Sequence, residues 1–237
     1  MKIILIESNK ERATTVCIEL NRNEIKSAII GMIIGDGCLS KHKGRKGNKV
    51  GNAYYQMKHC AEQYEYLMWK KEILDKVAKC KVWENNHTKD GKEYKGYRLY
   101  SKTNPVYTKL YNRFYQYKEK SLDEYLVKMI TPLALAIIYM DDGTMGKVYK
   151  KHNISKESFY LRLCNFDYAN LFLLKKSLKI KFDLDWNIIK HNKKYYQLRL
   201  LNRDNEKFID IIKPYVNMVP CMRYKLNTYI STPDNMV

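Results

Sequence analysis

The sequence predicts an α+β fold built from two similar halves. Two apolar runs end in Asp-Gly, at Asp36-Gly37 and at Asp142-Gly143, about half a chain length apart in a protein of 237 residues. Each run is followed by the same order of strand-like and helix-like patterns, which predicts antiparallel hairpins packed on helices. No Pro-, Gly- or Ser-rich linker interrupts the chain. We therefore expect one compact unit with halves at 1–120 and 121–237.

The first half begins with a helix that Asn23 is expected to cap and that ends near Ile34. Further elements are expected where the apolar spacing and the turn residues indicate them. These are strands at 38–42 and 52–59 around the basic loop 41–51, a helix within 61–79, strands at 82–87 and 94–101 around the turn 89–92, and a helix over 105–117.

The second half repeats this order. Thr131 is a good N-cap residue, and Pro132 suits the first position of the helix that follows. The remaining expected elements are strands at 144–149 and 158–165, a helix from the cap Asp167 to about 179, hairpin strands at 185–191 and 195–201, and a helix over 204–215.

The charge of the chain is strongly positive. It has 44 Lys and Arg residues and 25 Asp and Glu residues, a net charge of +19. Such an excess repels itself in a compact protein, so a polyanionic partner explains it better than solubility alone. No apolar stretch approaches the roughly 18–20 residues that span a bilayer, and the apolar run within 1–7 is too short for a signal peptide. Six scattered cysteines without a metal-binding spacing fit an intracellular, reducing compartment.

The two apolar helices are expected to pack against each other. Ala28, Gly31 and Gly35 share one helical face, and each glycine costs roughly 0.8–1 kcal/mol relative to alanine. Glycines on this face would let a second helix approach closely, which would explain why their cost is tolerated. The matching face there carries Ala134, Ile137 and Asp141, with Ile137 expected over Gly31. An ordinary core helix explains either run alone, but it does not explain the paired Asp-Gly endings.

The acids at the two helix ends form the candidate catalytic site. A helix C-terminus carries about half a negative charge, so Asp36 and Asp142 side by side create a concentrated negative site. Carboxylate and carbonyl oxygens are ligands for a hard cation such as Mg²⁺. A magnesium ion beside a phosphate polarises it and activates water, so the sequence indicates phosphate chemistry.

Both motifs resemble those of the LAGLIDADG homing endonucleases, in the single-chain branch that carries the motif twice. The resemblance rests on GMIIGDG at 31–37 and LALAIIYMDDG at 133–143, and it spans about 23–231. The lead-in 131–134 and the segment 219–226 are also similar to that branch. The resemblance implies two αββαββα halves with saddle-shaped antiparallel sheets, the motif helices at the centre, and a monomer.

The resemblance also implies roles for individual residues. Asp36 and Asp142 would coordinate Mg²⁺ beneath the minor groove of DNA, helped by the carbonyls of Gly35 and Asp141. Lys225 matches a basic position near the attacking water, and its first-half counterpart is expected to be Lys120, with Lys118 nearly as good. The sequence departs from the family pattern at Ile34, Met140 and Asp141, but both catalytic positions are kept.

Strand alternation predicts which side chains read DNA. One set should face the core: Tyr55, Met57, Tyr97, Leu99, Leu161, Leu163, Tyr196, Leu198 and Leu200. The outward set should contact base edges in the major groove: Gln56, Lys58, Arg98, Arg162, Gln197 and Arg199. For any one of these, a solvated surface charge is an equal alternative. Lys41, Lys43 and Lys46 are expected to contact phosphates.

The sequence therefore predicts a monomeric, Mg²⁺-dependent endonuclease that cuts double-stranded DNA at a long pseudo-palindromic site. The resemblance implies a role in the mobility of an intron or intein. An RNA maturase that binds intron RNA, or a regulator that binds without cutting, remains an alternative on the same scaffold. An unrelated basic nucleic-acid-binding domain is a third reading, but it leaves the repeat of the motif unexplained.

Overall fold

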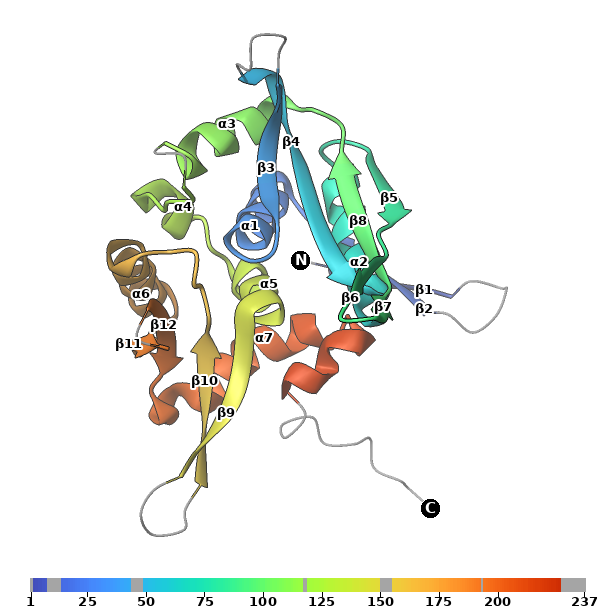
Figure 1. The fold of residues 1–237 in the computed structure, drawn as a ribbon. Coiled ribbons are helices and arrows are strands. Elements are labelled where there is room, and N and C mark those ends of the chain that lie inside the picture. The colour runs from blue at the N-terminus through green and yellow to red at the C-terminus, as the bar shows by residue number, and fades with distance from the viewer. Residues whose placement is uncertain are drawn as a thin grey trace, which may run out of the picture.

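Two halves with the same order of elements surround a pair of central helices (Figure 1). The computed structural model describes residues 2–7, 14–43, 49–116, 119–149, 155–192 and 194–226. The architecture is the predicted α+β fold, in which antiparallel strands form sheets and the helices pack against them. In the described part of the chain, no helix is both long and apolar enough to cross a membrane.

The first half contains a four-stranded antiparallel sheet in the order β3-β4-β8-β5. A short hairpin of β6 and β7 extends it through the turn Asp90-Gly91, where both residues have positive φ, 52° and 73°. The elements are α1 (Arg22–Ile34), β3 (Cys38–Lys43), β4 (Lys49–Cys60), α2 (Tyr64–Asp75), β5 (Cys80–Glu84), β6 (His87–Lys89), β7 (Lys92–Tyr94), β8 (Gly96–Ser101) and α3 (Pro105–Phe114).

The second half contains the equivalent sheet in the order β11-β12-β10-β9. The order of pairing along the chain matches that of the first half, as the repeat in the sequence predicts. The elements are α5 (Pro132–Asp142), β9 (Gly143–Tyr149), β10 (Ser155–Leu161), α6 (Tyr168–Phe182), β11 (Trp186–His191), β12 (Tyr195–Leu200), α7 (Asn205–Val216) and a 3₁₀ segment, η3 (Pro220–Leu226).

Other elements are not evident from the sequence pattern. An antiparallel hairpin of β1 (Lys2–Glu7) and β2 (Thr14–Glu19) precedes the first half. A short helix, α4 (Glu124–Lys128), leads into α5, and single 3₁₀ turns, η1 (Ala61–Gln63) and η2 (Asn202–Asp204), precede α2 and α7.

The start of α1 differs from the prediction, because its N-cap is Asn21 and not Asn23. The Asn21 side chain accepts hydrogen bonds from the N–H groups of Asn23 and Glu24, and the Glu24 carboxylate accepts the N–H of Asn21. This reciprocal capping box needs Glu three residues after the cap. Asn21 meets that condition and Asn23 does not.

The central helices α1 and α5 pack with their backbones in close contact. A Cβ atom added at Gly31 would lie 2.8 Å from the carbonyl oxygen of Ala134, and one added at Gly35 would lie 2.6 Å from Cβ of Asp141. The atoms nearest to Gly31 belong to Ala134 and not to Ile137, because the small side chain allows the close approach that a bulky one prevents. Helix α1 is buried from Ser27 to Ile34, and α5 is buried from Leu133 to Met140.

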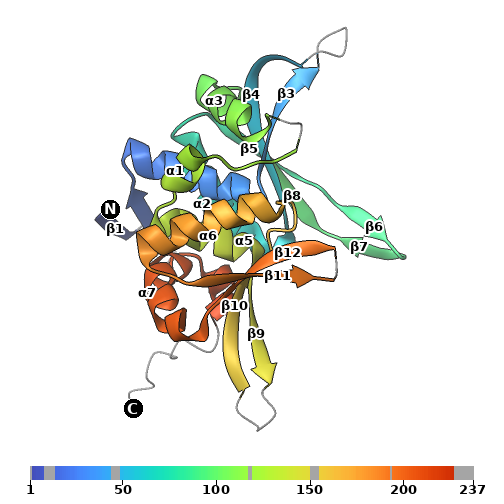
Figure 2. The same cartoon turned by 90° about the vertical axis from the view of Figure 1, so that its left-hand side faces the viewer.

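The helices and the sheets lie on opposite sides of the molecule. In Figure 2 the helices α1, α2 and α7 lie on the left, while the hairpin β6–β7 projects to the right, β3–β4 toward the top and β9–β10 toward the bottom. Because α1 and α5 run between the two halves, their C-terminal ends meet at the middle of the molecule (Figure 1).

Candidate functional site: paired carboxylates at the ends of two helices

Asp36 and Asp142 lie together where α1 and α5 end. Asp142 is the last residue of α5, and Asp36 follows α1 by two residues. Burial raises the pKa of Asp142 to about 7, and the charges of Asp36 and Asp141 add to the shift. Burial and then the charge of Asp141 raise the pKa of Asp36. Because the charge of Asp36 raises the pKa of Asp142, the two carboxylates lie close enough to interact electrostatically.

Two lysines donate to the carbonyl groups at these helix ends. Lys120 Nζ donates to the carbonyls of Gly35 at 3.1 Å and Gly37 at 2.9 Å. Lys225 Nζ donates to the carbonyl of Gly143 at 2.6 Å. Burial lowers the pKa of both ammonium groups, and the nearby acids oppose that shift. The geometry supports Lys120 as the counterpart of Lys225, while the alternative, Lys118, lies outside the described residues.

The Asp141 side chain is held mainly by groups other than the two paired carboxylates. It turns toward α2, where Oδ1 accepts hydrogen bonds from Lys70 Nζ at 2.5 Å and from the Tyr66 hydroxyl at 2.8 Å. Its other oxygen accepts the N–H of Asp36 at 3.2 Å. The side chains of Lys70 and Asp141 are fully buried. The metal ligand predicted at this position is the backbone carbonyl oxygen of Asp141, and the side-chain contacts described above do not involve that oxygen.

His59 extends this cluster on the side of Asp36. Its Nε2 lies 3.2 Å from Lys70 Nζ, and its Nδ1 lies 2.8 Å from Gln63 Oε1. Burial, followed by the charge of Lys70, lowers the pKa of His59 to about 4. The imidazole is therefore neutral at pH 7, accepting from Lys70 and donating to Gln63. Its Nδ1 lies 4.0 Å from Asp36 Oδ2.

Sequence reasoning missed Lys70, Tyr66 and His59. The signal was present in α2, where Lys70 occupies the same helical face as the buried Leu67 and Leu74. A lysine within an apolar face of a predicted core helix requires a buried acid. The identity of that acid was hidden, because Asp141 comes from the other half of the chain.

The donor set fits a hard divalent cation. Among the described residues, Asp36, His59 and Asp141 offer ligand atoms within 4.8 Å of one another. Lys70 Nζ already donates hydrogen bonds to the buried Oδ1 of Asp141 and to Nε2 of His59. The Asp36 side chain remains 40% exposed, and Asp142 is partly exposed beside it. Two oxygen-donating carboxylates with raised pKa values are therefore the groups available to a cation.

The expected DNA-reading residues of the first half lie on the exposed face of the sheet. Tyr55, Met57 and Leu99 are buried as predicted, and Tyr97 is partly buried against the core. Lys58 and Arg98 are exposed and lie opposite each other on β4 and β8. Gln56 is half-buried, and its Nε2 donates to Ser40 Oγ at 2.9 Å.

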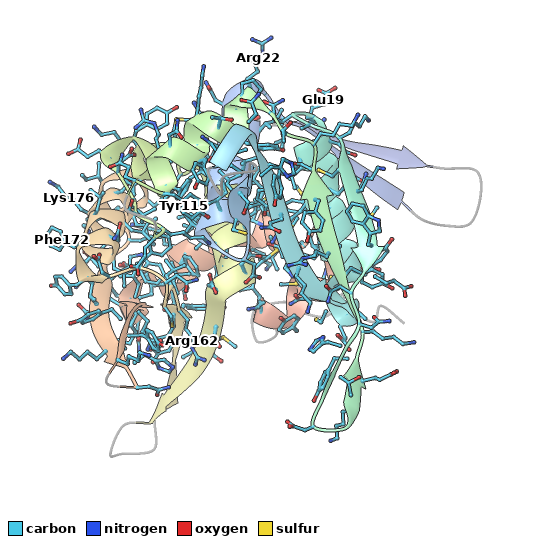
Figure 3. The ribbon with its side chains drawn as sticks, turned by 45° about the horizontal axis from the view of Figure 1, so that its top comes forward. Glu19, Arg22, Tyr115, Arg162, Phe172 and Lys176 are labelled. Atoms are coloured by element: carbon cyan, nitrogen blue, oxygen red, sulfur yellow. The ribbon has the colours of Figure 1, made fainter. Side chains whose placement is uncertain are left out.

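The second half differs from the prediction at Gln197. Arg162 is exposed after β10 (Figure 3), and the inward residues Leu161, Leu163, Leu198 and Leu200 are buried. Gln197 is only 6% exposed, and Arg199 is half-buried. Both lie on β12, which has neighbours on each side in β11 and β10 that shield its side chains. Within the described part of the chain, Gln197 Oε1 and Arg199 Nε are buried without a hydrogen-bond partner.

The lysines expected at phosphates are only partly described. Lys41 is half-buried, with Nζ 5.1 Å from the centroid of the Tyr111 ring. The side chain of Lys43, and Lys46 altogether, lie outside the described residues.

Of two grooves on the surface, one is lined by Asp36 and the other by neither Asp36 nor Asp142. One, of about 560 Å³, is lined by residues that include Asp36, Lys58 and His59. A larger groove, of about 900 Å³, lies between α1 and α3 and is lined by Arg22, Lys109 and others. Figure 3 shows Arg22 at the outer edge of the molecule, away from Arg162. Volume alone therefore does not mark the site, and only the smaller groove contains an acid of the pair.

Comparison with known proteins agrees with this geometry. A family model described as the LAGLIDADG DNA endonuclease family matches residues 26–208. The chain is 30% identical over 240 residues to the cytochrome b mRNA maturase bI2 of Saccharomyces cerevisiae, covering 94% of this chain and 52% of that protein. It thus spans about half the length of that relative. It is 27% identical over 219 residues to DNA endonuclease I-ChuI of Chlamydomonas applanata, covering 85% of this chain and 94% of that protein.

A solved structure is also similar. The homing endonuclease I-WcaI bound to its DNA recognition sequence has a TM-score of 0.71 with this chain at 27% sequence identity, and 85% of each chain is covered.

Proposed function

Because the chain belongs to the LAGLIDADG DNA endonuclease family, we propose that it is a site-specific, Mg²⁺-dependent endonuclease that hydrolyses both strands of a long pseudo-palindromic DNA site. One observation carries the proposal. Asp36 and Asp142, from distant parts of the chain, lie together at the ends of α1 and α5 with electrostatically coupled carboxylates. A protein that only binds nucleic acid has no need of clustered negative charge.

In this proposal the two carboxylates hold divalent cations. When bound, such ions polarise the scissile phosphate and activate a water molecule. Raised pKa values make the ionised carboxylates costly without a cation, so the protein is arranged to bind one. Lys120 and Lys225 place positive charge beside Asp36 and Asp142. Their ammonium groups would stabilise negative charge on the phosphate as the bond breaks.

The two sheets would carry DNA recognition. Arg98 and Arg162 are exposed, and an arginine can make a bidentate contact to guanine in the major groove. The net charge of +19 supplies affinity for phosphates that is independent of sequence.

A second function is favoured by one comparison. The S. cerevisiae relative is named a cytochrome b mRNA maturase, and a maturase on this scaffold would bind intron RNA. The proposal assigns Asp36 and Asp142 to DNA cleavage and not to RNA binding, so loss of both acids should separate the two activities. The proposed biological role, mobility of an intron or intein by a monomeric nuclease, follows from DNA cleavage and fails with it.

The test uses purified protein, Mg²⁺ and a plasmid that carries the joined sequences flanking the gene's own insertion point. The proposal expects linear product from the wild-type protein. It expects Asp36→Asn and Asp142→Asn to bind the same DNA without producing linear product. Cleavage at the wild-type rate by both variants would remove the carboxylates from the mechanism. Splicing support without any DNA cleavage would favour the maturase.

A further inference from the structure

The surroundings of Asp36 and Asp142 differ, although both acids end a motif helix. Asp142 is the last residue of α5, so its backbone N–H lies within the helix. Helix α1 ends at Ile34, two residues before Asp36. The N–H groups on either side of Asp36 turn back to carbonyls of α1, but the N–H of Asp36 donates to Oδ2 of Asp141 at 3.2 Å. An acid of the second half thus completes the end of the first motif helix.

Asp141 is fixed in that position by donors from α2. Lys70 Nζ and the Tyr66 hydroxyl both donate to its Oδ1, at 2.5 Å and 2.8 Å. The Lys70 ammonium also lies 4.1 Å from the centroid of the Tyr66 ring. The ion pair is fully buried, and burying two charges is often no more stabilising than apolar side chains of the same size. Stability alone is therefore a weak reason for its presence.

The contacts continue to the segment that carries Lys225. His59 links Lys70 to Gln63, and Gln63 Nε2 lies 3.3 Å from the Tyr224 hydroxyl. A continuous set of hydrogen bonds thus runs from the backbone of Asp36 to the residue before Lys225. It joins α2, the end of α5 and η3 on one side of the paired acids.

The described part of the second half has no equivalent. The residue of the first motif that faces Asp141 is Gly35, which has no side chain and no space for one. In α6, the counterpart of α2, the buried side chains are uncharged: Leu171, Leu174, Ser177 and Leu178. The pair of catalytic acids is therefore nearly symmetric, while its support is one-sided.

We propose that Asp141, held by Lys70 and Tyr66, is a positioning residue that fixes the backbone of Asp36, and that this one-sided support makes the two half-sites unequal in cutting their strands. The inference rests on the proposed nuclease function. It assigns Asp141 a role through its side chain, in addition to the role expected of its carbonyl oxygen.

Two double variants isolate the hydrogen bond from the charges. Lys70→Met/Asp141→Asn and Lys70→Met/Asp141→Leu both remove the buried ion pair and nearly preserve the volume. The asparagine can accept the N–H of Asp36, and the leucine cannot. Cleavage of each strand is followed separately with labels on the two 5′ ends. The Leu variant should slow one strand by about 10- to 100-fold relative to the other, while the Asn variant should keep the wild-type ratio.

Mn²⁺ binding, measured by electron paramagnetic resonance on the protein with and without DNA, gives a second readout. The Leu variant should bind Mn²⁺ about tenfold more weakly than the Asn variant, because support of a ligand contributes that much to affinity. Equal slowing of both strands, or equal Mn²⁺ affinity in the two variants, would overturn the inference. If the wild-type protein cuts neither strand, the proposed function fails and the Mn²⁺ comparison alone decides the role of Asp141.

Discussion

Lys120 and Lys225 occupy equivalent positions in the two halves. Lys120 Nζ donates to the carbonyl of Gly37 at 2.9 Å, and Lys225 Nζ donates to that of Gly143 at 2.6 Å. Each glycine directly follows one of the paired acids, Asp36 or Asp142. The two lysines therefore lie beside the acids in the same way, and the charge of each lowers the pKa of both Asp36 and Asp142.

Replacing either lysine should impair catalysis more than binding. Lys120→Met and Lys225→Met each remove an ammonium group from beside the acids, so the rate of cleavage should fall by about 10²- to 10³-fold. DNA affinity should change by less than about tenfold, because one phosphate contact among many is lost. Single-turnover cleavage and filter binding measure the two effects. Lys128→Met, at an exposed lysine on α4, is the control, and a similar loss of rate in it would contradict the assignment.

The stability of the metal-free protein should depend on the ionisation of Asp142. The pKa of its carboxyl is about 7 in the folded protein and 3.8 ordinarily. The folded state therefore keeps a proton that the unfolded state releases, and the free energy of unfolding should fall as pH rises from about 4 to about 7. Urea unfolding in the presence of a chelator measures this. The difference between wild type and Asp142→Asn should shrink at low pH; a difference independent of pH would contradict the shift.

Removing Lys70 alone should destabilise the fold. Lys70→Met leaves the Asp141 carboxylate buried without its partner, which costs about 3–5 kcal/mol of unfolding free energy. Lys70→Met/Asp141→Asn should recover most of that loss, because no buried charge remains. Lys71→Met removes a partly exposed pair with Asp75 and should cost less than about 1 kcal/mol. Equal losses of unfolding free energy in Lys70→Met and Lys71→Met would show that breaking the buried ion pair costs no more than breaking the partly exposed one.

The contact between the central helices should be sensitive to a single methyl group. Gly31→Ala places Cβ 2.8 Å from the backbone oxygen of Ala134, so the helices must move apart at a cost of about 1–3 kcal/mol. Gly146→Ala is the matched control. Its Cβ would contact the Tyr160 ring at 3.2 Å, which can move more easily than backbone. Thermal unfolding of both variants checks this, and a neutral Gly31→Ala would mean that the helices are less tightly packed.

Much of the fold follows from local patterns in the sequence. The motif helices, the hairpins and the inward residues of the strands are confirmed, because apolar period and turn residues are local signals. The N-cap of α1 was misplaced because two asparagines stand close together, and only Glu24 distinguishes them. The β1–β2 hairpin and α4 lacked a strong signal.

The site was less predictable than the fold. Asp36, Asp142 and Lys225 stand in motifs that sequence alone reveals. Lys70 stands on an apolar helical face, which indicates a buried acidic partner, but that partner, Asp141, comes from the other half and no local pattern identifies it. His59 contacts Lys70 and Gln63, and its role depends on that buried pair. Gln197 was expected to be exposed because it alternates with buried residues, but its burial depends on the strands at either side of β12.

The central claim is that Asp36 and Asp142 jointly hold the cations that act on DNA. Anomalous X-ray scattering from Mn²⁺, in crystals of the protein with a target duplex, tests it most directly. The account predicts Mn²⁺ peaks in contact with the carboxylates of both acids and with a backbone phosphate of the DNA. Peaks that contact neither carboxylate, or a duplex bound away from the ends of α1 and α5, would contradict it.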